Sequence, residues 1–215
     1  MGLLILKKIP ELLLPFFHNK FIEAGVDEVG RGCYAGPVYA AAVILPKDFY
    51  HPLLKDSKEL TREERHLLRP VIEKECYSFA VASVTNLEID RINILQASFK
   101  AMHLALHKLK TAPELLLIDG NRFKKYKKLP HRCIIKGDGM YASIAAASVL
   151  AKTYRDEYME NLHEKYVMYY WNKNKGYGTR EHRQAIEIHG LCRYHRKSFN
   201  IWPDFTTASE TMVED

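Results

Sequence analysis

At residues 21–32 the chain reads FIEAGVDEVGRG, an apolar run followed by two adjacent acids and a glycine-rich loop. Residues 21–26 predict a buried or half-buried strand. Asp27 and Glu28 follow directly, where this strand is expected to end. Core packing does not explain acids at such a place, because burying a charge costs free energy. The stretch therefore predicts a sheet that carries a polar site at its edge.

Two further acids follow apolar runs later in the chain. Asp119 lies in LLLIDG and Asp138 lies in IIKGDG, each next to a glycine. Carboxylates at the ends of strands can meet at one edge of a sheet although they are distant in sequence. Such oxygen ligands suit Mg²⁺ or Mn²⁺. Two of these ions together can activate a water and stabilise the leaving oxygen in phosphodiester hydrolysis.

Taken singly, the later acids have simpler explanations. Asp138 precedes a predicted helix that begins near Met140, so its side chain could act as a helix cap. Asp119 precedes Gly120 and could belong to an Asp-Gly turn. The pattern within each segment leaves these alternatives open.

The remaining pattern predicts one α/β domain with a central mixed β-sheet flanked by helices and a helical C-terminal subregion. The expected strands are 21–26, 37–45, 77–85, 114–119 and 132–136. The expected helices are 61–74, 88–110, a long one from about residue 140, and 179–189. The first two strands are separated by a glycine-rich loop and should form an antiparallel pair. A capping box, Thr61 with Glu64, should open the first helix.

Composition is compatible with a nucleic-acid partner but does not demand one. The 215 residues are 47% hydrophobic, which is enough to bury one sizeable core. An excess of 32 Lys and Arg over 26 Asp and Glu gives a formal charge of +6 and suits an anionic ligand. Residues 171–200 combine basic and aromatic side chains, which can contact phosphates and sugar or base faces.

The two ends of the chain differ from its centre. Residues 1–20 are interpreted as an N-terminal extension that packs on the domain, with apolar stretches too short and interrupted to span a membrane. Residues 201–215 are interpreted as a polar, acidic tail that frays. The four cysteines stand singly without metal-binding spacing, which favours a reduced, cytoplasmic compartment.

Six segments occur in a fixed order along the chain. They are GVDEVGRG, DSKELT, LIDGNR, KGDGMYASIAAASVLAKTYRD, NKGYGT and HRKSF. Together they closely resemble the ribonuclease HII family, the prokaryotic type 2 ribonucleases H. The resemblance runs from about residue 22 to residue 200, and 21–200 would form the catalytic domain. The preceding residues are too few for the additional N-terminal domain of ribonuclease HIII.

The resemblance implies a ribonuclease H-like fold and a metal-dependent endonuclease. Its substrates would be RNA/DNA hybrids and duplex DNA with embedded ribonucleotides, nicked on the 5′ side of the ribonucleotide. Two-metal-ion hydrolysis would leave 5′-phosphate and 3′-hydroxyl ends. The family's catalytic and metal-binding acids correspond to Asp27, Glu28, Asp119 and Asp138. The cofactor would be Mg²⁺ or Mn²⁺.

The same resemblance implies which residues read the substrate. Gly30, Arg31 and Gly32 would read the 2′-hydroxyl at the RNA-to-DNA junction through backbone groups, and Tyr177 would pack on the following deoxyribose. From the residues alone, the glycines could instead serve a tight turn with positive φ. An isolated tyrosine more often fills the core or the surface, so the role of Tyr177 rests mainly on the resemblance.

Other matching positions have weaker assignments. Ser57 and Lys58 correspond to a segment close to substrate phosphates, although Lys58 could be a solvated charge. The loop lysines could contact duplex phosphates, but a solvated loop is the favoured interpretation; they are Lys124, Lys125, Lys127 and Lys128. Arg155 and Asp156 are interpreted as partners of neighbouring side chains. A structural or phosphate-contacting role is expected for His182, His195 and Arg196 rather than acid catalysis.

The expected partners are nucleic acids, and the chain is expected to be a monomer. TTASETMVED at the C-terminus lacks the paired aromatic residues of a sliding-clamp peptide. Two other functional classes remain open. A non-catalytic nucleic-acid-binding module would leave the acids uncompensated near a polyanion. A different two-metal nuclease or nucleotidyl transferase would not explain Gly30–Gly32 together with Tyr177.

Overall fold

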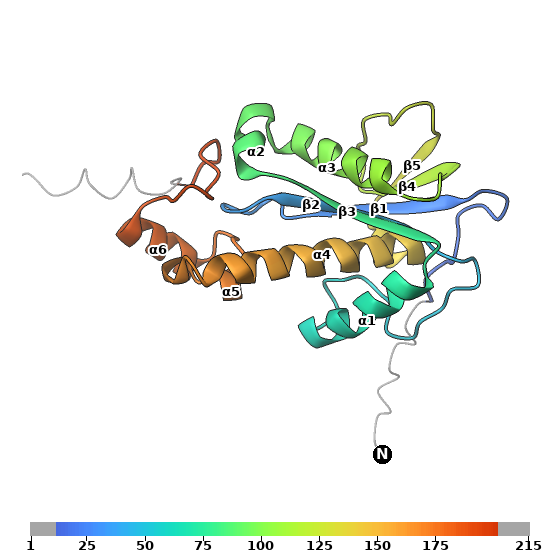
Figure 1. Cartoon of the computed structure of the whole chain (residues 1–215), viewed down its shortest axis with the longest axis horizontal. Helices are drawn as coiled ribbons and strands as arrows, with labels where there is room; N and C mark the ends of the chain where they lie inside the picture. Colours follow the sequence, from blue (N-terminus) through green and yellow to red (C-terminus); the bar gives the residue numbers. More distant parts are fainter. Residues whose placement is uncertain (1–11, 202–215) are drawn as a thin grey trace, which may run out of the picture.

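A five-stranded mixed sheet forms the centre of the computed structural model, which describes residues 12–201 (Figure 1). The strands are β1 (Glu23–Val29), β2 (Val38–Ile44), β3 (Ser78–Val84), β4 (Leu115–Asp119) and β5 (His131–Ile134). Their order across the sheet is β3-β2-β1-β4-β5. β1 is antiparallel to β2 and parallel to β4, so it is the central strand and joins the two halves of the sheet.

Helices cover both faces of this sheet. The α-helices are α1 (Arg62–Glu75), α2 (Asn86–Ile92), α3 (Ile94–Lys108), α4 (Ala142–His163), α5 (Trp171–Asn174) and α6 (Arg180–His189), and the 3₁₀ turns are η1 (Gly137–Gly139) and η2 (Val167–Tyr169). Figure 1 shows α2 and α3 on one face, α1 and α4 on the other, and α5 and α6 at the C-terminal end of α4. The α/β class and the helical C-terminal subregion predicted from the sequence are confirmed.

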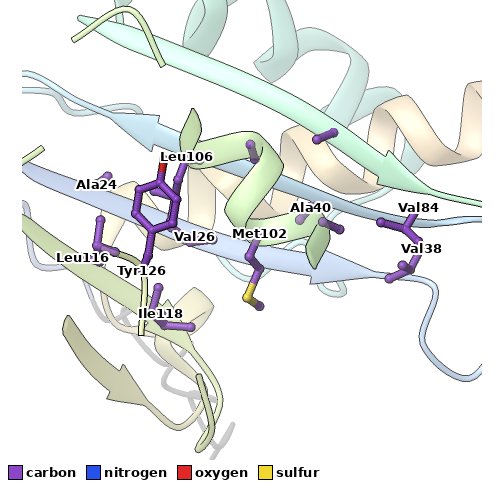
Figure 2. Packing of buried hydrophobic residues seen from close by; sticks show 14 of the residues in the cluster. Ala24, Val26, Val38, Ala40, Val84, Met102, Leu106, Leu116, Ile118 and Tyr126 are labelled. Atoms are coloured by element: carbon purple, nitrogen blue, oxygen red, sulfur yellow. The ribbon is translucent and has the colours of Figure 1, made fainter. Parts of the chain in front are cut away.

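The sheet is buried because apolar side chains on both faces meet the helices. On the α3 face, Val26 and Ile118 pack with Met102 and Leu106 (Figure 2). Removing each such side chain from water contributes roughly 1.5–3 kcal/mol. The opposite face packs against the alanine-rich first half of α4, where small side chains allow a close approach.

A very close approach occurs where α4 crosses β1 at Gly25. A Cβ at this glycine would lie 2.2 Å from the backbone carbon of Ser143. No side chain fits in that space, so the position requires glycine. The start of α4 is therefore held directly against the central strand, close to the acids that follow Gly25 in β1.

Several predicted boundaries need correction. The helix predicted for residues 88–110 is two helices, because Asn93 has a positive φ of 63° and its side chain caps α3 by accepting from the Gln96 N–H. Asparagine tolerates this conformation better than most residues. The first strand also extends to Val29, so Asp27 and Glu28 lie within β1 rather than after it.

Other local predictions are confirmed. Thr61 and Glu64 form both hydrogen bonds of the capping box at the start of α1. The predicted C-terminal helix is α6, which is capped by Thr179 and ends before Gly190. Side-chain oxygens at these positions satisfy backbone N–H groups that have no partner inside the helix.

Part of the predicted N-terminal extension lies on the domain. Leu14 exchanges backbone hydrogen bonds with Met140 and Ala142 at the start of α4, with N···O distances of 2.8 and 2.9 Å. The interpretations of residues 1–11 and of the tail sequence TTASETMVED concern residues outside 12–201. Within 12–201, no helix is long and apolar enough to cross a membrane.

Candidate active site

Three carboxylates from distant parts of the chain converge where the second half of β1 lies beside the end of β4. Val26 and Ile118 are paired in the parallel register, so the next residues, Asp27 and Asp119, lie side by side. Asp138 in η1 completes the group, and one carboxylate oxygen from each residue lies within 4.8 Å of the other two. The convergence follows from strand order, since parallel neighbours end at the same edge of a sheet.

Asp138 is held in its own turn and does not cap α4. The turn begins at Lys136, which has a left-handed φ of 58°, and it places Asp138 almost fully out of solvent. The N-cap of α4 is Tyr141, which makes no side-chain capping bond. The capping alternative for Asp138 is therefore excluded. Asp119 accepts a 2.8 Å bond from the N–H of Gly137, which ties β4 to the same turn.

The site is strained electrostatically in the absence of a cation. Burial is the largest cause that raises the pKa of Asp27 well above its ordinary value, and the charges of Glu28 and Asp119 raise it further. Burial and the charge of Asp138 raise the pKa of Asp119. Each shift means that the ionised cluster is unfavourable until positive charge enters it.

Glu28 lies beside this cluster rather than in it. Its carboxylate accepts a 3.1 Å hydrogen bond from the Arg31 guanidinium. Burial raises the pKa of Glu28, while the charge of Arg31 opposes that rise. The fourth predicted acid thus connects the carboxylate group to the loop that follows β1.

Lys58 places a positive charge at the cluster. Its Nζ donates a 2.9 Å hydrogen bond to Asp138 and lies 3.8 Å from Asp56. The bond to Asp138 is the largest cause that raises the pKa of Lys58. Lys58 is therefore not merely a solvated charge, although most of its side chain is exposed.

Ser57 has a different environment from its neighbour. It is buried and shares a 2.8 Å hydrogen bond with the hydroxyl of Ser148 on α4. A hydrogen bond from Ser148 in turn lowers the pKa of Asp27, in opposition to burial. Sequence reasoning missed Ser148, because it stands among small residues in an alanine-rich helix.

The donor set fits a hard divalent cation. Its ligand atoms are carboxylate oxygens, which Mg²⁺ and Mn²⁺ prefer. An isolated cluster of buried acids is costly, and a cation offsets that cost. The residues present are therefore suited to hold such a group.

The loop after β1 presents two glycines in different environments. Gly30 has a φ of +91°, and a Cβ there would lie 2.2 Å from Nε of Arg155. The tight-turn explanation therefore accounts for Gly30. Gly32 is not among the positive-φ residues, and a Cβ there would meet nothing within 4 Å. Neither packing nor φ explains this second glycine.

Tyr177 lies against the same loop. It forms an isolated β-bridge with Cys33, the residue that follows Gly32. Its side chain is partly open to solvent, with 38% of the residue exposed. Burial of the rest raises the pKa of Tyr177 to about 12, so the phenol is neutral at neutral pH. The fold thus places Tyr177 next to Gly32, although more than half of the sequence separates them.

A buried histidine pair supports the Tyr177 turn. His182 and His195 meet through their Nε2 atoms at 3.2 Å, and Nδ1 of His182 lies 2.8 Å from the Tyr177 carbonyl. The Cys192 N–H donates to Nδ1 of His195, so that ring carries its proton on Nε2. Both rings are neutral and fully partnered, consistent with the structural role expected from the sequence.

The remaining predicted positions are more dispersed. Lys124 and its neighbouring loop lysines are exposed, in agreement with a solvated loop. Asp156 pairs with Lys152 at 2.8 Å and lies 3.7 Å from Arg65. Arg155 is fully buried and bonds to backbone carbonyls, so the predicted pairing with neighbouring side chains holds for Asp156 alone.

The fold and the carboxylate cluster define a metal-dependent nuclease of the ribonuclease H-like class. The family model for ribonuclease HII matches residues 24–201. Ribonuclease HII of Bacteroides thetaiotaomicron is 62% identical over 193 residues, which span 90% of this chain and 96% of that protein. The chain belongs to the ribonuclease HII family.

Solved structures share this fold. The ribonuclease H2 of Pyrococcus horikoshii OT3 superposes with a TM-score of 0.69 at 24% identity, over 83% of this chain and 94% of that one. Bst-RNase HIII, solved in complex with Mn²⁺, gives a TM-score of 0.66 at 22% identity, over 83% of this chain and 67% of that one. The ribonuclease H-like architecture inferred from the sequence is confirmed.

Proposed function

We propose that the chain cleaves the RNA strand of RNA/DNA hybrids and nicks duplex DNA on the 5′ side of single embedded ribonucleotides. The ends produced are a 5′-phosphate and a 3′-hydroxyl. Family membership supports the activity on hybrids and embedded ribonucleotides. The proposed position of the cut rests on one observation: β1 continues directly into the Gly30–Gly32 loop, so the carboxylates lie beside that loop. A Cβ at Gly32 would meet no atom within 4 Å, which leaves room for a sugar.

Asp27, Asp119 and Asp138, with Glu28 at their side, would hold Mg²⁺ or Mn²⁺. Two such ions, when bound, supply an activated water and stabilise the charge that develops on the departing oxygen. The Mn²⁺ complex of Bst-RNase HIII is the reason to test both metals.

The chain's own residues position the substrate around this centre. The Lys58 ammonium is exposed at the edge of the cluster, where it can contact a phosphate oxygen while it pairs with Asp138. Ser57 shares a hydrogen bond with Ser148, and the Ser148 hydroxyl lowers the pKa of Asp27, which favours the ionised form of that carboxylate. These contacts reduce the reorganisation needed when the substrate binds.

The groups that read the sugar are Gly30, Arg31, Gly32 and Tyr177. The absence of a side chain at Gly32 allows the backbone to approach a ribose closely. The neutral, partly exposed ring of Tyr177 offers a flat apolar surface for the next deoxyribose. A 2′-hydroxyl is the group that distinguishes RNA from DNA at a single position.

We also propose that the enzyme acts as a monomer. Every carboxylate of the cluster and every group of the sugar-reading loop comes from one chain. No second copy is needed to complete this proposed site.

The test is cleavage of matched duplexes that carry none, one or several ribonucleotides, each in Mg²⁺, Mn²⁺ or chelator. We expect cleavage only where a ribonucleotide is present and only with metal. Mapping the products should place the cut on the 5′ side of the ribonucleotide, and polymerase extension should detect the 3′-hydroxyl. Equal cleavage of the all-DNA duplex, or undiminished cleavage in chelator, would contradict the proposal.

A further inference from the structure

Two arginines are completely buried beneath the Gly30–Gly32 loop. Arg155 comes from α4 and Arg196 from the segment after α6, and both have 0% of their surface exposed. Among the described residues, neither guanidinium lies within ion-pair distance of a carboxylate. A buried charge without an ionic partner is unusual, because desolvation makes it expensive.

Arg196 is instead bonded to the loop's backbone. Its Nη2 donates to the Gly30 carbonyl at 2.6 Å, its Nη1 to the Arg31 carbonyl at 2.8 Å, and its Nε to the Gly36 carbonyl at 3.0 Å. Hydrogen bonds from a charged donor are stronger than neutral ones. The guanidinium therefore fixes the direction of two successive peptide groups in this loop.

The direction of these carbonyls determines where the amide groups point. There are no cis peptides in the described residues, and in a trans peptide the N–H points away from the carbonyl. The peptides that begin at Gly30 and Arg31 turn their oxygens inward to Arg196. Their N–H groups, which belong to Arg31 and Gly32, therefore point outward, and neither donates a hydrogen bond within residues 12–201.

Arg155 joins the segment just after this loop to the turn that carries Tyr177. It donates to the carbonyls of Ala35 and Pro37 at 3.2 and 3.0 Å, and to the carbonyl of Lys175 at 2.9 Å. Its guanidinium carbon also lies 5.8 Å from the centre of the Tyr177 ring. One side chain thus sets the separation between the loop and the tyrosine.

Both arginines add positive charge directly under the outward amides. Burial, with a smaller contribution from Arg155, lowers the pKa of Arg196 to about 10, so it stays charged at neutral pH. Positive charge behind outward N–H groups favours electronegative oxygens in front of them.

We propose that Arg196 and Arg155 are positioning residues for ribose recognition. Arg196 holds the amides of Arg31 and Gly32 outward as paired donors to sugar and phosphate oxygens, and Arg155 fixes Tyr177 at the matching distance. This inference rests on the proposed sugar-reading role of the loop. It proposes that two buried side chains, which would not contact the substrate, set the orientation of the loop amides and the position of Tyr177.

The experiment measures ribose preference separately from cleavage. In an Asp119→Asn background, which is expected to bind without cutting, fluorescence anisotropy gives the affinity for a duplex with one ribonucleotide and for the identical all-DNA duplex. Arg196→Lys and Arg155→Lys are compared with Arg69→Lys, which changes an arginine on α1 that pairs with Glu73 and Glu157. Thermal melting monitors folding of each variant.

Lysine keeps the positive charge, but its ammonium group lacks the planar set of N–H donors with which the guanidinium bonds to three carbonyls. We expect Arg196→Lys to reduce the preference for the ribonucleotide duplex roughly 10-fold, the effect of about one or two hydrogen bonds. Arg155→Lys should reduce it less, and Arg69→Lys should leave it unchanged. A merely structural role would lower the amount of active protein without changing the ratio of the two affinities.

Three results would overturn the inference. An unchanged ratio in folded Arg196→Lys protein would refute the positioning role and leave the proposed function intact. Equal binding of both duplexes by the Asp119→Asn parent would instead refute the sugar-reading role itself. Global unfolding of both lysine variants would assign the two arginines to overall stability rather than to loop orientation.

Discussion

The exposed ammonium of Lys58 donates a 2.9 Å hydrogen bond to the buried carboxylate of Asp138, which lies 80 positions later in the chain. The pair joins the loop before α1 to the turn before α4. It also leaves part of the lysine free at the mouth of the carboxylate cluster. Such a partly exposed pair contributes little to stability, so its importance is expected in substrate binding.

Lys58→Ala should therefore lower kcat/KM on a single-ribonucleotide duplex by roughly 10- to 100-fold, since it removes a phosphate contact. The free energy of unfolding should fall by no more than about 1 kcal/mol, because most of the lysine side chain is exposed. Lys74→Ala, at the exposed end of α1, is the matched control. An equal loss of activity in both variants would point to overall charge rather than to this position.

Asp119→Asn should separate activity from stability. We expect cleavage to fall by at least about 100-fold, because a metal-ligating oxygen loses its charge. Melting in chelator should occur at a higher temperature than for the wild type, because burial and the charge of Asp138 make the ionised Asp119 carboxylate unfavourable. Asp48→Asn, at an exposed loop position, should change neither property. A lower melting temperature for Asp119→Asn in chelator would contradict the electrostatic argument.

The two loop glycines should respond differently to alanine. Gly30→Ala forces a Cβ against Arg155 at a positive φ and should cost about 1–3 kcal/mol of stability. Gly32→Ala meets no atom within 4 Å, so its stability should be close to that of the wild type. Its KM for a ribonucleotide duplex should nevertheless rise, because the new methyl group occupies the space left for the sugar. Unchanged kinetics for Gly32→Ala would remove the reason to place a sugar there.

The buried histidine pair should make the fold sensitive to acid. Burial, followed by the neighbouring His182, lowers the pKa of His195 from 6.5 to about 4 in the folded state. Between these values the unfolded chain binds a proton that the folded chain does not. Stability is therefore full above about pH 6.5 and is lost as the pH falls towards 4, by up to about 3 kcal/mol for this residue.

Urea titrations at several pH values measure this dependence. His195→Gln should flatten the decline in unfolding free energy between pH 6.5 and 4. His189→Gln, which alters an exposed histidine at the end of α6, should keep the wild-type slope. Identical slopes in all three proteins would exclude His195 as the source of acid sensitivity.

The convergence of the acids was accessible from sequence because local signals and chain order agree. Asp119 ends a continuous apolar run, and Asp27 follows another, so both were expected at the edge of one sheet. Which acids approach most closely depends on register. The pairing of Val26 with Ile118 aligns Asp27 with Asp119, whereas Glu28 turns towards Arg31. No local pattern contains that information.

Contacts between distant segments were less accessible. Ser148 reads as one more small residue in an alanine-rich helix, and only packing against the Ser57 loop reveals its hydrogen bond. Arg155 and Arg196 look like ordinary basic residues in sequence. Their partners are backbone carbonyls, which every residue possesses, so no residue type marks the contact in advance.

Because α4 packs closely on Gly25, this helix can fix the distance between two parts of the proposed site. Ser148, in its first half, lowers the pKa of Asp27 in the carboxylate cluster. Arg155, seven residues later, bonds to the carbonyls of Ala35 and Pro37, just after the Gly30–Gly32 loop. Seven residues of α-helix span about 10 Å and resist compression. The offset between the sensed ribose and the broken bond would thus be a fixed length of helix. An insertion or deletion between these two residues would change the distance between the site that recognises the ribose and the site of cleavage.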